Sequence, residues 1–543
     1  MSAERAGTAG LIAAGVSVAG TFAVAVAGPS VMEPALPGRP GQPPWSLGLQ
    51  PSPYLTIGLT ATALALGAFG LVLMLRAVRR GWSVPARAVL IAGLLAAAAL
   101  TLVPPFGSSD HLSYAAYGRM LVTGHNPYTT TPAQLAALGD PVARAVQDWR
   151  GAPSVYGPLA TAIQALASLA GGTSVRLTVF VLGLANLAAF AGVALLLHRM
   201  TRPDPARQRR AALLWAANPV LLQVLVAGAH VDGQAVVFGV AAVAVMSPVL
   251  SRGASAPPVA GRPLGRAAAA GVLVGLGFAV KVTIALTGLG LAIALGYGCW
   301  RRRQAWRELW PPLAALGAGF AVTAGAALAV GGSALLRQTS QASDMVSIGS
   351  PWRVIRSLIQ LAVTGTAATD IVKAGAVALA LVLAVLLVRG LAGTGMTNEP
   401  GAPLAAGPGA APGRYATVAF ALALAWLFAW PYVLPWYDAL GWALLPLAAG
   451  GAAESLGWLL LARTTALGFG YLPARQADAP LPSGLGWLQP VIRHGITPAV
   501  LAGATVWLVV LMVRSRRVMQ AGPPGADKAS GAAGSPAAEA KAA

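Results

Sequence analysis

Charged side chains occupy only 10% of this chain, whereas 56% of its residues are hydrophobic. A soluble globular protein carries roughly 25% charged residues, because water must wet its surface. Over 543 residues, so few charges cannot cover a water-soluble core. The composition therefore excludes an ordinary soluble enzyme and also a disordered or fibrous chain, and it predicts a helical protein that crosses a membrane many times.

Apolar windows long enough to cross a bilayer, about 20 residues each, recur along the chain. They predict about fourteen transmembrane helices, near residues 9–28, 54–75, 88–105, 175–198, 211–229, 233–250, 266–281, 283–299, 312–331, 369–388, 416–431, 437–450, 455–472 and 496–513. Two further apolar stretches, 157–171 and 354–366, are too short to cross and are interpreted as re-entrant or interfacial. The predicted fold is an all-α polytopic membrane protein.

The basic residues orient these helices. A formal net charge of +21 would suggest nucleic-acid binding in a soluble protein, but the chain has no basic, aromatic-rich module, so we expect no nucleic-acid partner. Arginines instead gather between predicted spans, as at 76–87, 199–210 and 301–307, which is typical of cytoplasmic loops. We therefore predict a multi-pass protein of the plasma membrane (the inner membrane of the cell) with both termini in the cytoplasm.

Acidic and histidine side chains collect on the opposite, extracytoplasmic side. The most informative stretch is 104–128 (PPFGSSDHLSYAAYGRMLVTGHNPY), in which two prolines end a span and a serine caps a new helix. Asp110 then lies in the first turn, and Tyr114 and Tyr117 share its face, so we expect an amphipathic helix on the outer surface. The alternative is a first-turn charge beside an interfacial aromatic belt.

Polar residues also stand at the predicted outer ends of apolar helices. His230 and Asp232, in the hairpin GAHVDGQ, form either a structural clamp or the wall of a site. Lys281 falls near the turn of a predicted hairpin over 267–298. A cation at that depth is either a phosphate ligand or a side chain that snorkels to the interface.

Two more outer segments hold candidate ligands. Arg337 and Arg353 lie in a predicted loop, 332–356, and arginine suits bidentate phosphate recognition, although loop charges are often simply solvated. Trp436 and Tyr437, in the run WPYVLPWYD, form either an interfacial belt or walls that stack on a sugar or guide an isoprenoid chain.

Several signatures are missing from the sequence. There is no Asp-x-Asp pair to chelate the metal of a nucleotide sugar and no Walker motif for an ATP-driven pump. No His-Glu-x-x-His motif or Cys/His cluster offers a metal site. Cys299 is the only cysteine, which excludes an intrachain disulfide. We expect no metal and no cofactor.

Taken in order, these motifs resemble a known family. The run Asp110-His-Leu-Ser-Tyr114, with Tyr117-Gly-Arg119 and Gly124-His-Asn-Pro-Tyr128, is similar to the first large extracytoplasmic loop of GT-C glycosyltransferases. More narrowly, it resembles the actinobacterial polyprenol-phosphomannose-dependent α-(1→6)-mannopyranosyltransferases. Four shorter motifs follow in matching order over most of residues 80–515: Val155-Tyr-Gly-Pro158, Ala229-His-Val-Asp-Gly233, Lys281-Val-Thr and Leu434-Pro-Trp-Tyr-Asp438.

The resemblance implies a GT-C-like helical bundle that takes mannose from polyprenol-phosphate-mannose. The implied acceptor is a mannan or a lipid-linked mannoside outside the membrane, with α-(1→6) linkages made for lipomannan or another cell-envelope polysaccharide. Asp110 would be the catalytic base of an inverting single displacement. The other candidates would hold the sugar or the phosphate: His111, Tyr114, Arg119, His125, Tyr128, Tyr156, His230, Asp232, Lys281, Arg337, Arg353, Trp436, Tyr437 and Asp438.

The apolar windows, two Gly/Ala/Pro-rich tracts and the resemblance together suggest how the chain is divided. The predicted parts are N-terminal transmembrane helices (1–80), a GT-C-like catalytic core (81–395) with an outer loop (106–157), a cytoplasmic linker (396–413), C-terminal transmembrane helices (414–518) and a disordered tail (519–543).

Other functions remain open at this point. A related enzyme would transfer another polyprenol-phosphate sugar, such as arabinofuranose. A secondary transporter or lipid flippase would suit the many spans, although transporters place charged sites near the midplane and often show repeated halves. A non-catalytic scaffold for envelope assembly is the third alternative.

Overall fold

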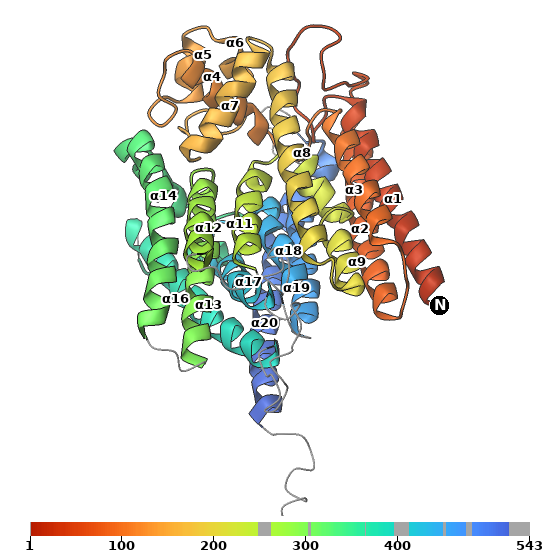
Figure 1. Cartoon of the computed structure of the whole chain (residues 1–543). Helices are drawn as coiled ribbons and strands as arrows, with labels where there is room; N and C mark the ends of the chain where they lie inside the picture. Colours follow the sequence, from red (N-terminus) through yellow and green to blue (C-terminus); the bar gives the residue numbers. More distant parts are fainter. Residues whose placement is uncertain are drawn as a thin grey trace, which may run out of the picture.

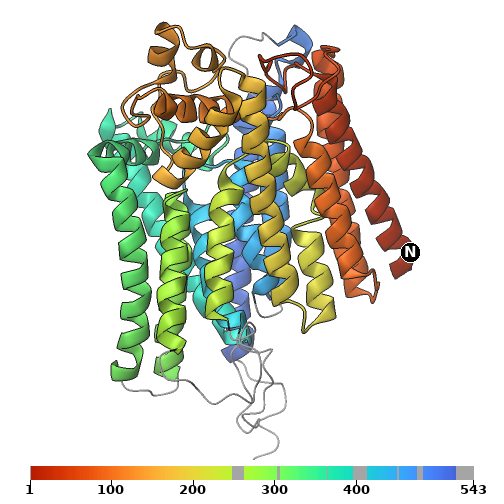
Figure 2. The ribbon, with the colours of Figure 1, turned by 45° about the horizontal axis from the view of Figure 1, so that its top comes forward.

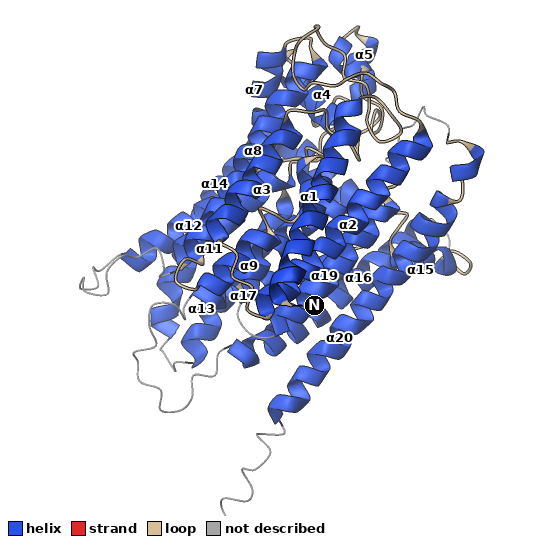
Figure 3. Ribbon diagram, turned by 90° about the vertical axis from the view of Figure 1, so that its right-hand side faces the viewer, coloured by secondary structure: helices blue, strands red, loops and turns tan. Residues whose placement is uncertain are grey.

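The computed structural model describes residues 2–247, 262–301, 306–363, 365–395, 412–448, 452–473 and 481–520. These residues form helices and connecting loops and contain no strand (Figure 3). The predicted linker 396–413 lies outside the described residues except for 412–413, and the predicted tail 519–543 does so except for 519–520.

The helices fall into four consecutive groups. The first is α1 (Ala3–Ala27), α2 (Pro53–Arg79) and α3 (Ala86–Thr101). The second is α4 (Asp110–Val122), α5 (Pro132–Ala137), α6 (Pro141–Arg144) and α7 (Pro158–Gly171). The third is α8 (Val175–Met200), α9 (Pro205–Leu214), α10 (Pro219–Leu221), η1 (Leu222–Val226), α11 (Asp232–Met246), α12 (Arg262–Phe278), η3 (Val282–Ile284) and α13 (Ala285–Arg301). The fourth is α14 (Trp306–Ser343), α15 (Pro351–Ile359), α16 (Thr366–Gly395), α17 (Pro412–Ala429), η4 (Pro435–Asp438), α18 (Ala439–Leu444), η5 (Leu445–Leu447), α19 (Ala452–Gly470), η6 (Ser483–Leu485), η7 (Leu488–Ile496) and α20 (Thr497–Gln520).

The long helices run side by side, and the second group forms a cap at one end of the bundle (Figures 1 and 2). The beginning of α1 and the end of α20 both lie toward the end of the molecule away from this cap (Figure 1). The arginine-rich start of α9 also lies away from it. The cap and the basic loops are therefore at opposite ends.

Among the described residues, six helices are long and apolar enough to cross a membrane. They are Ala3–Ala27, Pro53–Arg79, Val175–Met200, Arg307–Ser343, Thr366–Leu391 and Ser483–Arg514. Shorter apolar helices accompany them, among them Asp232–Met246 and Gly413–Ala429. The structure thus confirms an all-helical protein with membrane-spanning segments, whereas the figure of about fourteen spans remains a prediction.

The predicted loop over 332–356 is wrong in its first part. Gly332 has a φ of 62°, a left-handed conformation that glycine adopts without a steric penalty. The chain kinks at Gly332, and helical structure resumes to Ser343. The segment expected to begin the loop is therefore a bend within α14.

The outer helix of the first loop forms where expected but is not a surface helix. It begins at Asp110 and ends at Val122, and its residues from His111 to Gly118 are all buried. The short apolar stretch over 157–171 is α7, which packs directly on α4. A Cβ atom at Gly118 would lie 2.1 Å from the Gln164 carbonyl oxygen, so this close approach requires glycine.

A buried ion pair lies in the C-terminal half. Asp438 at the end of η4 pairs with Arg463 of α19, and their side chains are 0% and 2% exposed. The Thr464 hydroxyl donates a hydrogen bond to Asp438 Oδ2 at 2.7 Å, and it accepts one from the Trp442 indole at 3.0 Å. Removing one partner of such a pair leaves an uncompensated charge in an apolar surrounding.

We predict that Arg463→Met lowers the free energy of unfolding by about 3–5 kcal/mol, because it strands the Asp438 carboxylate. The double variant Asp438→Asn/Arg463→Met removes both charges and should recover much of that loss. Thermal unfolding in detergent, followed by tryptophan fluorescence, measures both, with Arg353→Met on the exposed α15 as the control. Equal loss in the single and double variants would contradict the role of the pair.

Candidate active site

Asp110 is the first residue of α4, and local hydrogen bonds hold its turn in place. Its backbone N–H donates to the Ser108 hydroxyl at 3.1 Å. The Ser109 hydroxyl donates to Asp148 Oδ2 at 2.7 Å, and the Ser113 hydroxyl donates to the Asp148 carbonyl oxygen at 3.4 Å. The loop that carries Asp148 is thus tied to both sides of the Asp110 turn, and the Asp110 side chain stays 16% exposed.

Two cavities meet at Asp110. The larger, of about 400 Å³, we call the Lys281 cavity; besides Asp110, its lining includes Lys281, Tyr114, Tyr156, Trp426 and Tyr437. The second, of about 340 Å³, we call the Asp148 cavity; its lining includes Asp110, Ser109, Asp148, Tyr471, Arg493 and Thr497. Trp149, Met345, Tyr432 and Leu434 also border both. Each volume is in the range of small-molecule sites, about 300–1,000 Å³.

Lys281 is fixed by its turn and by two side chains. Its Nζ lies 2.6 Å from Asp232 Oδ1 at the start of α11, and 3.6 Å from the centre of the Tyr437 ring. The preceding turn is joined to the cap because the Gly157 N–H donates to the Val280 carbonyl oxygen at 3.1 Å. A Cβ at Gly157 would lie 2.2 Å from the Ala279 carbonyl oxygen, so glycine is required there.

Aromatic rings form much of the wall of the Lys281 cavity. The Tyr156 hydroxyl donates to the Tyr114 hydroxyl at 3.3 Å, and the two rings meet edge to face with centroids 5.2 Å apart. On the opposite side, Tyr437 stacks with Trp426 at 5.8 Å. These amphipathic rings offer both apolar faces and hydroxyl groups to a ligand.

His230 lies behind Asp110 and is buried, with 1% side-chain exposure. Its Nδ1 is 3.6 Å from Asp110 Oδ2, and its ring stacks on Trp436 with centroids 3.5 Å apart and 12° between the planes. The backbone beside it is held in a left-handed turn, with Ala229 at φ 52° and its carbonyl oxygen accepting from Asn186 Nδ2 at 2.8 Å. This packing holds the imidazole ring next to the carboxylate.

The surroundings raise the proton affinity of Asp110. Burial, and next the negative charge of Asp148, raise the pKa of Asp110 to about 6, while a Trp149 hydrogen bond and Lys281 oppose that rise. Burial lowers the pKa of the neighbouring His111 to about 3, and within the described residues its ring nitrogens have no hydrogen-bond partner. Asp110 is therefore a carboxylate poised near neutrality, a property suited to a general base.

Eight of the residues predicted for the site gather around these cavities: Asp110, Tyr114, Tyr156, His230, Asp232, Lys281, Trp436 and Tyr437. His111 is next to them but fully buried. Trp436 is 3% exposed, so it belongs to the interior and not to an interfacial belt.

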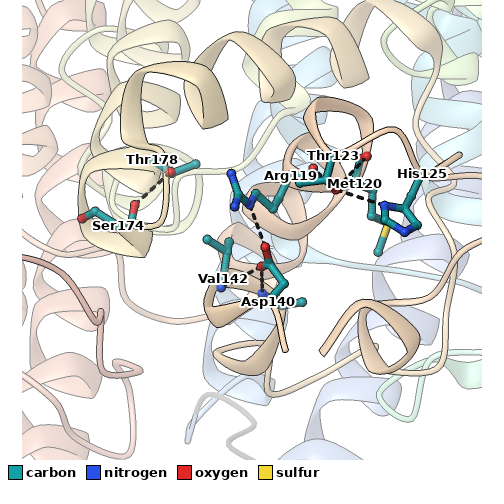
Figure 4. Close-up of polar contacts among 9 residues, drawn as sticks. Arg119, Met120, Thr123, His125, Asp140, Val142, Ser174 and Thr178 are labelled. Atoms are coloured by element: carbon teal, nitrogen blue, oxygen red, sulfur yellow. Dashed lines mark hydrogen bonds and ion pairs between the residues drawn. The ribbon is translucent and has the colours of Figure 1, made fainter. Parts of the chain in front are cut away.

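Other predicted residues lie elsewhere in the cap. Arg119 Nε pairs with Asp140 Oδ2 at 2.7 Å, and that carboxylate also caps α6, so Arg119 stabilises the cap (Figure 4). His125 faces the Thr123 hydroxyl at 3.1 Å on the same helix end (Figure 4). The Tyr128 hydroxyl is within 3.1 Å of the Thr161 hydroxyl and is buried. None of the three borders either cavity.

Three predicted ligands from the second half of the chain are also separate from the cavities. Arg337 is exposed on α14 and donates to Ser333 Oγ at 3.1 Å, and Arg353 is exposed on α15. Asp438 is engaged with Arg463. The sequence could not show whether a charged residue between predicted spans binds a ligand or is simply solvated, because local sequence patterns are similar in the two cases.

Residues that the motifs did not single out complete the Asp148 cavity. Trp149 has a φ of 62°, which no sequence pattern indicates, and Tyr471 and Arg493 reach the cavity from distant helices. Arg463 could have been found, since it interrupts the apolar stretch 455–472 and such a charge needs a partner. Among the described residues no group of three or more His, Cys, Asp or Glu side chains could hold a metal ion.

Comparison with known proteins identifies the family. The family model described as "Alpha-(1->6)-mannopyranosyltransferase, N-terminal domain" matches residues 7–297, more than half of the chain. The chain belongs to this alpha-(1->6)-mannopyranosyltransferase family. The matched range contains Asp110, His230, Asp232 and Lys281, so the catalytic candidate and its charged neighbours lie within the part that this mannopyranosyltransferase family shares.

Individual relatives in the family match over shorter regions. An alpha-(1->6)-mannopyranosyltransferase of Mycobacterium tuberculosis is 33% identical over 136 residues, 24% of this chain and 22% of the relative. A probable alpha-(1->6)-mannopyranosyltransferase of Mycolicibacterium smegmatis is 32% identical over 136 residues, 24% of each chain. Alpha-(1->6)-mannopyranosyltransferase B of Corynebacterium glutamicum is 28% identical over 134 residues, 24% of this chain and 22% of the relative.

The alignments thus span less than a quarter of the length of these curated relatives. No solved structure matches the chain.

Proposed function

We propose that this protein transfers mannose from a polyprenyl phosphate mannose to a mannoside acceptor and forms an α-(1→6) linkage. The observation that carries the proposal is the position of Asp110, a partly buried carboxylate where two cavities meet, one of which contains a lysine. Membership in a family named for alpha-(1->6)-mannopyranosyl transfer supports the sugar and the linkage.

The proposed chemistry is a single displacement at the anomeric carbon of the donor. The acceptor 6-hydroxyl oxygen forms a bond to mannose C1 while the bond from C1 to the phosphate oxygen breaks, and its electron pair leaves with the phosphate. Asp110 accepts the hydroxyl proton as the attack proceeds. A β-linked donor then gives an α-linked product, with inversion.

Lys281 fits the role of the phosphate ligand. An ammonium group has three N–H donors, and Asp232 engages it from one side at 2.6 Å, which leaves donors for phosphate oxygens in the cavity. A positive charge beside the departing phosphate stabilises the negative charge that develops there. Because a lipid phosphate leaves without protonation by an acid, the reaction that we propose needs neither a second carboxylate nor a metal or other cofactor.

We further propose that the site faces the extracytoplasmic side of the plasma membrane. The cap is at the opposite end of the bundle from the arginine-rich helix α9, and basic loops favour the cytoplasm. A lipid-linked sugar donor would then enter from the outer leaflet. The product would be a cell-envelope mannan or lipoglycan such as lipomannan.

The first test is the loss of the base. Asp110→Asn should keep expression and folding but lower the rate of mannosyl transfer by at least about two orders of magnitude, because an amide cannot accept the proton. The measurement uses membranes, radiolabelled polyprenyl phosphate mannose and a short α-1,6-mannoside. Asp204→Asn, at an exposed carboxylate that caps α9, is the matched control. Near-normal turnover by Asp110→Asn would remove this residue from the mechanism.

The second test is the pH dependence of the rate. Since the base works only when ionised, kcat/KM should fall as the pH drops below about 6, the pKa of Asp110. Asp148→Asn removes the neighbouring negative charge that raises this pKa, so it should move the midpoint of the acidic limb to lower pH. A midpoint that stays in place or moves upward would contradict Asp110 as the titrating base.

The third test separates phosphate binding from charge balance. Lys281→Gln should raise the KM for the donor about tenfold or more, the loss expected for one charge-assisted hydrogen bond. This single variant also strands the Asp232 carboxylate, so the double variant Asp232→Asn/Lys281→Gln serves to restore the balance. The double variant should recover thermal stability while the donor KM stays high. Recovery of donor binding as well would show that Lys281 only neutralises Asp232.

A further inference from the structure

We infer that the Asp148 cavity is the acceptor subsite and binds a neutral mannoside through hydroxyl contacts and ring stacking. This inference rests on the proposed function, because it asks which cavity holds which substrate of that reaction. The Asp148 cavity is then a second binding site, next to Asp110 but separate from Lys281.

In a single displacement, the donor phosphate and the acceptor hydroxyl lie on opposite sides of the anomeric carbon. The attacking oxygen reaches the anomeric carbon from the face opposite the departing phosphate, and its proton must be within reach of Asp110. With the phosphate beside Lys281, the acceptor hydroxyl has to come from the other side. The Asp148 cavity is the second space that borders Asp110, and Lys281 is not part of its wall. The basic residue in that wall, Arg493, already donates to the carbonyl oxygens of Gly470 and Pro473.

The wall of this cavity has the chemistry that a sugar needs. The Asp148 carboxylate accepts one hydrogen bond from Ser109 at 2.7 Å, and a carboxylate has about four acceptor positions, so it can also accept from sugar hydroxyls. Tyr471 packs edge to face on Trp436 with centroids 5.1 Å apart, which fixes its ring at the cavity wall. A fixed ring face and a carboxylate together suit a polar molecule with apolar C–H faces.

Trp149 borders both cavities. Its backbone is in the left-handed region at φ 62°, which is rare for a bulky residue and persists only where the surroundings hold it. The adjacent Asp148 supplies that hold through Ser109 and Ser113 of the α4 turn. The indole is 40% exposed and borders both cavities, so it is placed to contact the sugars on either side of Asp110.

Most of this wall comes from the second half of the chain. Apart from residues 108–110 and 148–149, every lining residue of the Asp148 cavity lies at position 345 or beyond. These residues are outside the family match over 7–297. The acceptor preference of this enzyme would accordingly be set by the C-terminal half of the chain, while the base and the lysine lie in the matched part.

The experiment blocks each cavity separately with a tryptophan. Ile348 is a half-exposed loop residue that lines the Asp148 cavity, and Ala342 is a half-exposed residue of α14 that lines the Lys281 cavity. Ile348→Trp should raise the KM for methyl α-1,6-mannobioside about tenfold and leave the KM for polyprenyl phosphate mannose within about twofold. Ala342→Trp should raise the KM for polyprenyl phosphate mannose about tenfold and leave the KM for the mannobioside within about twofold. Val330→Trp, on an exposed face of α14, is the control.

A second variant removes a charge from the wall of the Asp148 cavity and keeps the shape of that wall. Asp148→Asn, measured near pH 8, where Asp110 is ionised in both proteins, should raise the acceptor KM and leave the donor KM unchanged. A rise in the donor KM with Ile348→Trp or Asp148→Asn, or no change in either KM, would overturn the assignment while transfer itself persists. Absence of transfer by the unaltered protein would instead reject the proposed function, and this inference with it.

Discussion

The Lys281–Asp232 ion pair joins the turn between α12 and α13 to the start of α11, at 2.6 Å. A charge in an apolar helical bundle is costly unless it has a partner, and this pair satisfies both groups at once. The turn that carries Lys281 is also joined to the cap, because its Val280 and Ala279 carbonyl oxygens accept backbone hydrogen bonds from Gly157 and Leu159 at the start of α7. The ion pair and these two hydrogen bonds together connect α11, the α12–α13 turn and the cap beside the Lys281 cavity.

Asp110 differs from Asp232 and Asp438 in its partners. Asp232 and Asp438 each have a cation within ion-pair distance, whereas Asp110 faces a histidine at 3.6 Å and the two cavities. Burial and a neighbouring carboxylate then make protonation easier. A carboxylate that borders a cavity and that the fold does not neutralise with a cation is accessible to a substrate, and this arrangement separates Asp110, the candidate base, from Asp232 and Asp438.

The sequence motifs predicted the local backbone structure around the candidate site. The helix that begins at Asp110, the turn at Lys281 and the hairpin before Asp232 each follow from proline, glycine and capping residues within a few positions. The motifs did not separate Arg119 from Lys281 as phosphate ligands. Both are basic residues near an outer turn, and both pair with an aspartate in the structure. They differ because Lys281 lines a cavity, whereas Arg119 borders neither cavity.

Low charge and long apolar windows by themselves determined that this chain is a helical membrane protein, because bilayer thickness and unsatisfied backbone polar groups allow few other solutions. The order of motifs determined its family and indicated Asp110. Tertiary structure alone decided that α4 is buried, that Asp438 belongs to a structural pair, and that Trp149 borders two cavities. These outcomes depend on contacts between residues far apart in the chain, and no local pattern encodes which distant helix supplies the partner.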